Sequence, residues 1–486
     1  MLKSKINLFD AVTLIIGLGF FVFVGSKSIF TSFTHDEAYS YNNIVGGSFM
    51  DIVSYKFTTA NNHMLNSVLM KWAEFIFGNS EWSLRMPNTI GHVLYLLFSF
   101  KLLKRLNVSY LIIPFFLLLN ANPYLLDFFS LARGYGLSIG LLMASLYFFY
   151  SYIEQQEVKY YKYALVFMGL SVFSSFVIIY VFIGLIISYN IIQLLKQGSS
   201  ILNLKTIVEI NKPSLIGMSV VLIVLFEPVR KLTEAKQLYF GGETSFIHDS
   251  IGFLIGSLLH YGNYSNSINT FILYSFLGLI LLAGFVSLMN LIDKKKLVVL
   301  SFTLVLLILL FTVFLTTTIN HYLLGSKFII QRTALFLFPI VILCLVFVLT
   351  YFYQTKKGKL LSVGFSFCLA FLFSQHTQKC ANSYSYFDWH YDINSKGIME
   401  ALNQEHISKA KATMGAHPFF APTANYYKAK YKMDWLSPVS RDGIDSAKHY
   451  DYIFGQLKNI EEFEDYKSNL IITFEDNNNY LYKNKE

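Results

Sequence analysis

Three ionisable residues, His35, Asp36 and Glu37, stand side by side in the stretch FTSFTHDEAYSYNN (residues 30–43), directly after the first apolar run. A carboxylate in such a place can act as a general base that removes a proton from an attacking hydroxyl. The simpler interpretation is that both acidic residues begin a helix, where they gain from the helix dipole and need no further role. Polar residues in other loops favour the first interpretation if the fold brings those loops together.

The same loop continues with Asn61, Asn62 and His63, which precede an amphipathic stretch at 64–78. Apolar side chains recur on one face of this stretch at helical spacing. We expect the helix to lie in the plane of the membrane interface, with its apolar face used for packing. The polar group just before it is a better candidate for a functional site.

Two later segments add charged residues. Asp127 and Arg133 are six positions apart, a spacing that does not share a helix face, so a simple intrahelical salt bridge is not expected. Lys327 and Arg332 stand just before another apolar run. Each basic residue could be an ordinary anchor at the membrane edge. Alternatively, cations placed there bind an anionic partner, and arginine is well suited to phosphate.

Membrane helices must position these residues. Of the 486 residues, 54% are hydrophobic and 14% are charged, whereas soluble proteins have about 25% charged residues. Long continuous apolar runs favour helices over barrel strands, and we expect about eleven spans. The runs lie near 10–30, 88–104, 108–121, 135–152, 162–174, 175–195, 213–227, 269–292, 297–319, 334–353 and 360–375. A further run at 251–259 is too short to cross alone, and we expect it to be re-entrant or interfacial.

The distribution of Lys and Arg predicts the orientation. With the N-terminus in the cytoplasm, every strong basic cluster falls on the cytoplasmic side, as the positive-inside bias requires. These clusters are Lys3/Lys5, Lys101/Lys104/Arg105, Lys159/Lys162, Lys196/Lys205, Lys294–Lys296 and Lys356/Lys357/Lys359. All the candidate residues then fall on the extracytoplasmic side. The net charge of +9 is therefore an orientation signal, and we expect no nucleic-acid partner.

We predict two domains, a transmembrane catalytic domain at 1–375 and a small extracytoplasmic α/β domain at 376–486. Charge density rises in the second part, and the segments DYIFG and NLIITFE are typical of short strands. The three cysteines show neither a disulfide framework nor the spacing of metal ligands. The first apolar run lacks a small-residue cleavage site and is interpreted as a membrane helix.

Five motifs carry a resemblance to a known family. HDEAY, ANNHMLNSVLM, GNSEWSLRMPN, NPYLLDFFSLARGYG and QRTALFLFP resemble, in this order, the polyprenyl-phosphate-sugar-dependent glycosyltransferases of the GT-C type. Within that group, the chain is similar to bacterial relatives of the protein O-mannosyltransferases and aminoarabinose lipid A transferases. The resemblance is best over residues 30–150 and 320–340. It implies a multi-pass α-helical protein of the bacterial cytoplasmic (inner) membrane, with interfacial loop helices and an extracytoplasmic active site.

The resemblance also implies roles for particular residues. Asp36 and Glu37 would be catalytic, with Asp36 as the usual candidate for the general base. Four residues would bind the donor phosphate, namely His63, Arg133, Lys327 and Arg332. Four others would support the site, namely His35, Asn62, Asp127 and Tyr135. Arg85 would be structural. Met64 stands where relatives often have a proline after the basic residue, which is a departure from the family pattern.

The implied reaction is an inverting sugar transfer from an undecaprenyl-phosphate donor to an acceptor outside the cytoplasm. A carboxylate would deprotonate the acceptor hydroxyl, and cations would stabilise the departing phosphate. Membrane lipids are further partners, and the acceptor could be a glycan, a lipid or a protein. No ligand set in the sequence demands a divalent metal, although some enzymes of this type use one.

Two other functions fit a similar topology. An O-antigen ligase or polymerase would need several outer-loop arginines, and the loop 228–268 offers only Arg230 beside Lys231. A lipid-linked glycan flippase or transporter would need ionisable residues inside the spans and an internal repeat. The apolar runs contain few charges and show no convincing repeat, so the transferase is favoured.

Overall fold

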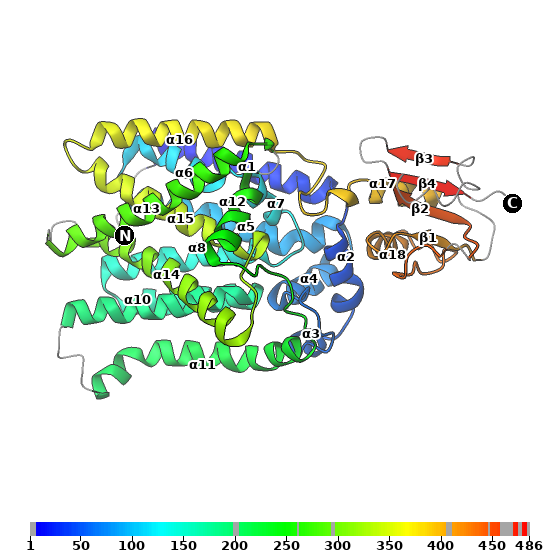
Figure 1. The fold of residues 1–486 in the computed structure, drawn as a ribbon, viewed down its shortest axis with the longest axis horizontal. Coiled ribbons are helices and arrows are strands. Elements are labelled where there is room, and N and C mark those ends of the chain that lie inside the picture. The colour runs from blue at the N-terminus through cyan, green and yellow to red at the C-terminus, as the bar shows by residue number, and fades with distance from the viewer. Residues whose placement is uncertain are drawn as a thin grey trace.

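The computed structural model describes residues 6–197, 204–259, 262–292, 297–404, 411–445, 448–456, 470–474 and 479–483. Long helices form a bundle, and a small domain lies at one end of it (Figure 1). The helices of the bundle are α1 (Leu8–Phe30), α5 (Glu81–Arg105), α6 (Ile112–Asn120), α8 (Tyr135–Gln155), α9 (Val158–Ser174), α10 (Ile179–Gln197), α11 (Leu204–Glu234), α13 (Asn266–Ile292), α14 (Leu297–Leu324), α15 (Leu337–Tyr353) and α16 (Lys359–Cys380). Short 3₁₀ turns precede two of them, η2 (Ser109–Leu111) before α6 and η3 (Phe176–Ile178) before α10.

Each of the eleven predicted apolar runs falls on one of these helices, which confirms a multi-pass helical membrane protein. Within the described ranges, six helices are long and apolar enough to cross a membrane alone. They are α1, α8, α10 with its 3₁₀ turn, α13, α14 and α16. A seventh candidate is a broken pair, in which α6 and α7 (Pro123–Phe129) meet at 72°. The other helices of the bundle are shorter or more polar.

The centre of the bundle is α8. In its apolar window 89% of residues are buried, against 22% in α1 and in α16, whose side chains face outward. The contact of α8 with α5 is close because Gly91 and Gly140 face each other. A Cβ atom at either glycine would meet backbone atoms of the opposite helix. This pair therefore fixes the distance between two helices that carry residues of the candidate site.

Basic residues gather at one end of the bundle. Lys104 pairs with Asp10 (2.7 Å) and Arg105 with Glu154 (3.0 Å), which brings together the start of α1 and the ends of α5 and α8. Of the basic clusters, Lys3, Lys5 and Lys294–Lys296 lie outside the described residues. From this end, α1 carries the chain across the bundle, because 23 residues rise by roughly 34 Å in a helix.

Short helices occupy the opposite end (Figure 1). They are α2 (His35–Ser40), η1 (Tyr41–Val45), α3 (Phe49–Val53), α4 (Met64–Phe77), α7, η5 (Phe246–Gly252), α12 (Phe253–Leu259) and η8 (Gln331–Ala334). The run at 251–259 ends in a helix of seven residues, far too short to span. In α4 the expected packing of the apolar face is wrong. Trp72 and Phe75 are exposed, and the face with Asn66 and Ser67 is buried.

The tail forms the predicted small α/β domain. It contains η9 (His390–Asp392), α17 (Ser395–Gln404), α18 (Ala421–Lys430) and the strands β1 (Met414–Ala416), β2 (Tyr452–Gln456), β3 (Leu470–Phe474) and β4 (Asn479–Lys483). The strand order is β1-β2-β4-β3, with β1 and β2 parallel and the other neighbours antiparallel. The domain packs on the first loop, where the Phe33 amide donates to the Tyr427 hydroxyl (2.8 Å). The boundary at residue 375 stays a prediction, and α16 continues to Cys380.

Candidate active site

The acidic pair lies in the first turn of α2. Thr34 caps this helix, and its backbone amide donates to the Glu37 carboxylate (2.9 Å) in a capping box. The helix-start interpretation of the pair is therefore correct for Glu37. Asp36 points elsewhere, because its side chain keeps 13% exposure while that of Glu37 has none.

Glu37 is enclosed by protein donors. Its two oxygens accept from the Nε and Nη2 of Arg85 (2.8 and 2.7 Å), and one also accepts from the Ala132 amide (2.5 Å). Arg85 spends its remaining donors on the carbonyls of Ser28, Thr31 and Ser32. A carboxylate that is saturated in this way has no lone pair for a substrate proton. The structure thus gives Glu37 a structural position rather than the expected catalytic one.

Asp36 faces two arginines. The Nη2 of Arg133 lies 3.4 Å from its Oδ2. Burial alone would raise the pKa of Asp36, but the positive charges of Arg133 and Arg332 outweigh burial and hold this pKa below its usual value. The carboxylate is therefore ionised at neutral pH and can accept a proton. The structure brings these three predicted residues together from positions 36, 133 and 332.

Arg133 is held by the first loop. Its Nη2 donates to the Asn61 side-chain oxygen (3.0 Å), and its Nη1 to Ser40 Oγ (3.3 Å). Asn61 was noted only as a neighbour of His63, yet it is the residue that orients this guanidinium. Asn62, the expected supporting residue, instead fixes the loop by donating to the Ile52 carbonyl (2.9 Å).

His63 lies at the start of α4, packed edge-on against Tyr135 with 4.7 Å between ring centroids. Its Nδ1 donates to the Ser174 carbonyl (3.0 Å), and Gly134 leaves the space that this approach requires. Burial and the charge of Arg133 lower the pKa of His63 to about 3. The ring is therefore neutral, and the expectation that it adds positive charge for a phosphate is not met.

Arg332 lies in η8, with its guanidinium between the rings of Phe240 (4.5 Å) and Trp389 (5.3 Å). In the described part of the chain the guanidinium of Arg332 makes one polar contact, with the Asp388 carboxylate at 3.4 Å. Most of its donors are thus available, in contrast to those of Arg85. Burial acts against the charge of Arg332, but the negative charges of Asp388 and Asp36 outweigh it and raise the pKa of the guanidinium, so it stays charged. A guanidinium held flat with unused donors suits an incoming anion.

Two predicted residues lie outside this cluster. Lys327 pairs with Glu243, and both side chains are partly or largely exposed. Asp127 pairs with Lys27 at 2.5 Å, where both side chains are buried. Lys27 stands inside the first apolar run, and a lone lysine near a helix end gives no signal that it will be paired.

The segment between α16 and α17 contributes residues that the sequence did not reveal. The ring of Tyr386 lies under both Lys27 (4.8 Å) and Arg85 (5.2 Å). Asp388 contacts Arg332 and accepts from the Tyr124 hydroxyl (3.2 Å). The alternation of aromatic and acidic residues in SYSYFDWHYD was the available signal, but the partners of Tyr386 and Asp388 are more than 50 residues away.

The same segment joins the tail to α2. The His35 backbone amide donates to Asp392 (2.6 Å), and its Nδ1 donates to the Phe419 carbonyl (2.7 Å). Burial lowers the pKa of His35 and raises that of Asp392 to about 8. His35 therefore fixes α2 against the tail domain.

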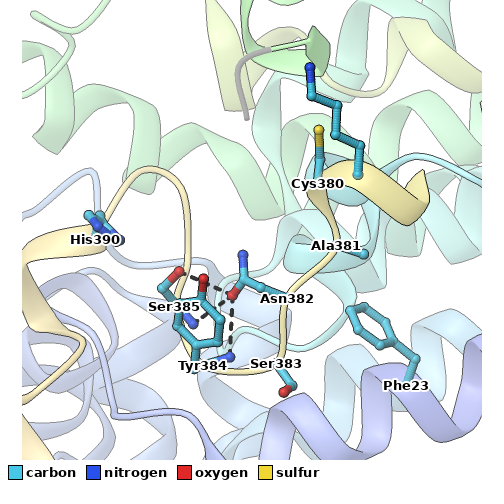
Figure 2. A pocket seen from close by; sticks show the side chains of 9 residues that line it. Phe23, Cys380, Ala381, Asn382, Ser383, Tyr384, Ser385 and His390 are labelled. Atoms are coloured by element: carbon cyan, nitrogen blue, oxygen red, sulfur yellow. Dashed lines mark hydrogen bonds between the residues drawn. The ribbon is translucent and has the colours of Figure 1, made fainter. Parts of the chain in front are cut away.

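No group of three His, Cys, Asp or Glu side chains in the described ranges could hold a metal ion. The neighbours of Asp36 are arginines, whose charge opposes a cation. A separate hollow of about 560 Å³ lies beside the end of α16, where Asn382 accepts from the amides of Tyr384 and Ser385 (Figure 2). None of the predicted site residues lines this hollow.

Comparisons with known proteins concern part of the sequence and the overall fold. Residues 65–229 match the family model described as dolichyl-phosphate-mannose-protein mannosyltransferase. The crystal structure of ArnT from Cupriavidus metallidurans bound to undecaprenyl phosphate is 12% identical (TM-score 0.51), covering 98% of this chain and 97% of that one. The apo structure of the same protein is 13% identical (TM-score 0.53), with the same coverage. No curated protein matches in sequence. The resemblance to GT-C type glycosyltransferases is thus confirmed in part of the sequence and in the whole fold.

Proposed function

We propose that this protein is an inverting membrane glycosyltransferase that moves a sugar from a polyprenyl-phosphate donor to an acceptor outside the cytoplasm. The matched family model indicates a glycosyltransferase, and the ArnT structure with the shared fold holds undecaprenyl phosphate. The observation that carries the proposal is the juxtaposition of Asp36 with Arg133 and Arg332. The ionised carboxylate can deprotonate the attacking hydroxyl. The two arginines supply positive charge for this carboxylate and for the departing phosphate.

Asp36 acts as the general base. Its carboxylate accepts the proton of an acceptor hydroxyl, whose oxygen then attacks the anomeric carbon of the donor sugar. Such base catalysis contributes typically about 10²–10⁴-fold to a rate. Arg133 keeps the carboxylate ionised and, through Asn61, fixes its direction.

Arg332 binds the departing phosphate. As the bond from the anomeric carbon to the phosphate oxygen breaks, negative charge builds on the phosphate, and a fixed guanidinium stabilises it. Attack and departure on opposite faces of the sugar invert the anomeric configuration. Because a phosphate is a good leaving group, the reaction needs cations there more than an acid.

The proposed orientation puts the end with α2 and the tail domain outside the cytoplasm. The basic clusters support it, since Lys104 and Arg105 lie at the other end of the bundle, as the positive-inside bias requires. A donor with a membrane-bound prenyl chain and a phosphate at the outer surface would then reach Arg332 from the bilayer.

The test supplies membranes that contain the protein with a radiolabelled undecaprenyl-phosphate sugar and with a membrane-fraction acceptor. We expect release of undecaprenyl phosphate together with a labelled product whose anomeric configuration, read by NMR, is opposite to that of the donor. Retention of configuration would contradict the single displacement. Use of a diphosphate-linked glycan instead would favour the ligase, and movement of the donor across the bilayer without transfer would favour the flippase.

A further inference from the structure

The C-terminal domain contacts His35, the residue next to Asp36. His35 is tied through its side chain to the Phe419 carbonyl and through its amide to Asp392. These contacts hold one surface of the tail domain directly beside the proposed base.

Aromatic rings continue outward from this point. The ring of Tyr391 stacks on that of Phe419, with 5.5 Å between centroids and 30° between planes. The His417 ring meets Phe419 at 5.0 Å. Burial raises the pKa of the Tyr391 hydroxyl, and the negative charge of Asp36 raises it further. The rings thus extend from His35, the residue next to Asp36, to the exposed side chain of Phe419.

Phe419 is 53% exposed, although it is a large apolar side chain next to a buried centre. The other neighbours of Asp36 have assignments. Arg133 and His63 are buried in the bundle, and Arg332 is the proposed phosphate contact. The Tyr391–Phe419 pair therefore lies on the exposed side of this region and has no proposed role in binding the donor.

We propose that the rings of Tyr391 and Phe419 form a platform that binds the acceptor as a sugar ring, with one of its hydroxyls directed at Asp36. The inference rests on the proposed function and names its acceptor class. The face of an aromatic ring is negative and attracts positive hydrogen edges, and one face of a pyranose presents such C–H groups.

The test is a saturation-transfer NMR measurement on the full chain in nanodiscs, with methyl glucoside, methyl galactoside and methyl N-acetylglucosaminide as probes. We expect saturation of the C–H protons on one ring face of a glycoside. The Phe419→Ala variant should weaken this binding by about two- to tenfold, which corresponds to the loss of one ring contact. The Phe419→Trp variant should restore it, and Tyr384→Ala, which removes an exposed ring elsewhere, should leave it unchanged.

Equal glycoside binding by Phe419→Ala and the wild type would overturn the platform, as would the absence of glycoside binding. Binding of a Ser/Thr peptide in place of every glycoside would overturn it in favour of a protein acceptor. Donor binding is read separately, as retention of the radiolabelled undecaprenyl-phosphate sugar, and sugar transfer as release of undecaprenyl phosphate in the same preparations. If the wild type releases none, the proposed function fails. If Phe419→Ala binds the donor normally and loses the glycoside, the platform is supported.

Discussion

Asp36 and Glu37 are adjacent in the chain, yet they belong to two different regions of the molecule. Glu37 lies in a saturated region, where Arg85 and two backbone amides use all the lone pairs that the carboxylate offers. Asp36 lies in an unsaturated region, where Arg133 stands at 3.4 Å and Arg332 has most of its donors unused. The hydrogen-bonding partners of each carboxylate, and not its residue type, therefore decide which of the two can react.

The same contrast separates the arginines. Arg85 is fully buried and makes five hydrogen bonds, so its charge serves to join the end of α1, the turn after it and α2. Arg332 lies between two rings with one recorded polar contact in the described part of the chain. Counting unused donors thus distinguishes an arginine that holds the fold from one that can hold a ligand.

The largest effect on activity is expected from Asp36→Asn, which keeps the shape of the side chain but removes the base. Sugar transfer in membranes should fall by about 10²–10⁴-fold, while the amount of inserted protein stays the same. The matched control is Asp51→Asn, in the same loop but more exposed, which should transfer at the wild-type rate. Full activity of Asp36→Asn would show that Asp36 is not the general base.

Glu37→Gln should act on stability instead. Breaking one side of a buried ion pair costs about 3–5 kcal/mol because the remaining charge has no partner. The thermal unfolding midpoint in detergent should fall clearly. The control is Glu154→Gln, which breaks the partly exposed pair with Arg105 and should cost less than about 1 kcal/mol. Equal midpoints for the two variants would show that the Glu37 region is not a structural clamp.

Arg332→Ala should weaken donor use. A hydrogen bond to a charged group contributes about 1.5–3 kcal/mol, so the donor KM should rise by about 10- to 100-fold with a smaller change in the acceptor KM. Arg332→Lys should recover part of this loss, because it keeps the charge without the planar fork. Arg230→Ala, on the exposed side of α11, serves as the control. A rise in the acceptor KM alone would move Arg332 out of the phosphate site.

The last prediction concerns Asp392, a third carboxylate, which is buried and has no cation among its contacts in the described part of the chain. Its pKa rises from 3.8 to about 8 on folding, so the folded state holds a proton that the unfolded state releases between these values. The free energy of unfolding should therefore fall as the pH rises through this range. Asp392→Asn should reduce the drop in melting temperature between pH 5 and pH 8. An unchanged drop would assign it to other groups.

Much of this arrangement was predictable from the sequence. The apolar runs predicted the helices, and the basic clusters predicted that the polar loops lie together at one end of the bundle. Asp36, Arg133 and Arg332 could be grouped for this reason. Both signals are local or periodic, and they depend on the membrane as a solvent. The two-domain prediction likewise followed from a change of composition after α16.

The pairing of individual charges was not predictable in the same way. Nothing near Glu37 indicates that Arg85 will saturate it, since the two residues are 48 positions apart. Lys27 and Asp127 are 100 positions apart, and a single lysine near a helix end has an ordinary interpretation as a surface anchor. The exposed aromatic face of α4 shows a related limit, because periodicity reveals an apolar face without telling whether protein or lipid covers it.

The position of Tyr386 has a consequence for biosynthesis. Its ring covers Lys27 and Arg85, two cations made very early, yet the ribosome adds it only after the last long helix is complete. Until then, the nascent chain carries these cations without their cover and Arg332 without Asp388. The ring over Lys27 and Arg85 and the Asp388 contact of Arg332 therefore form only after the helices of the bundle have been made.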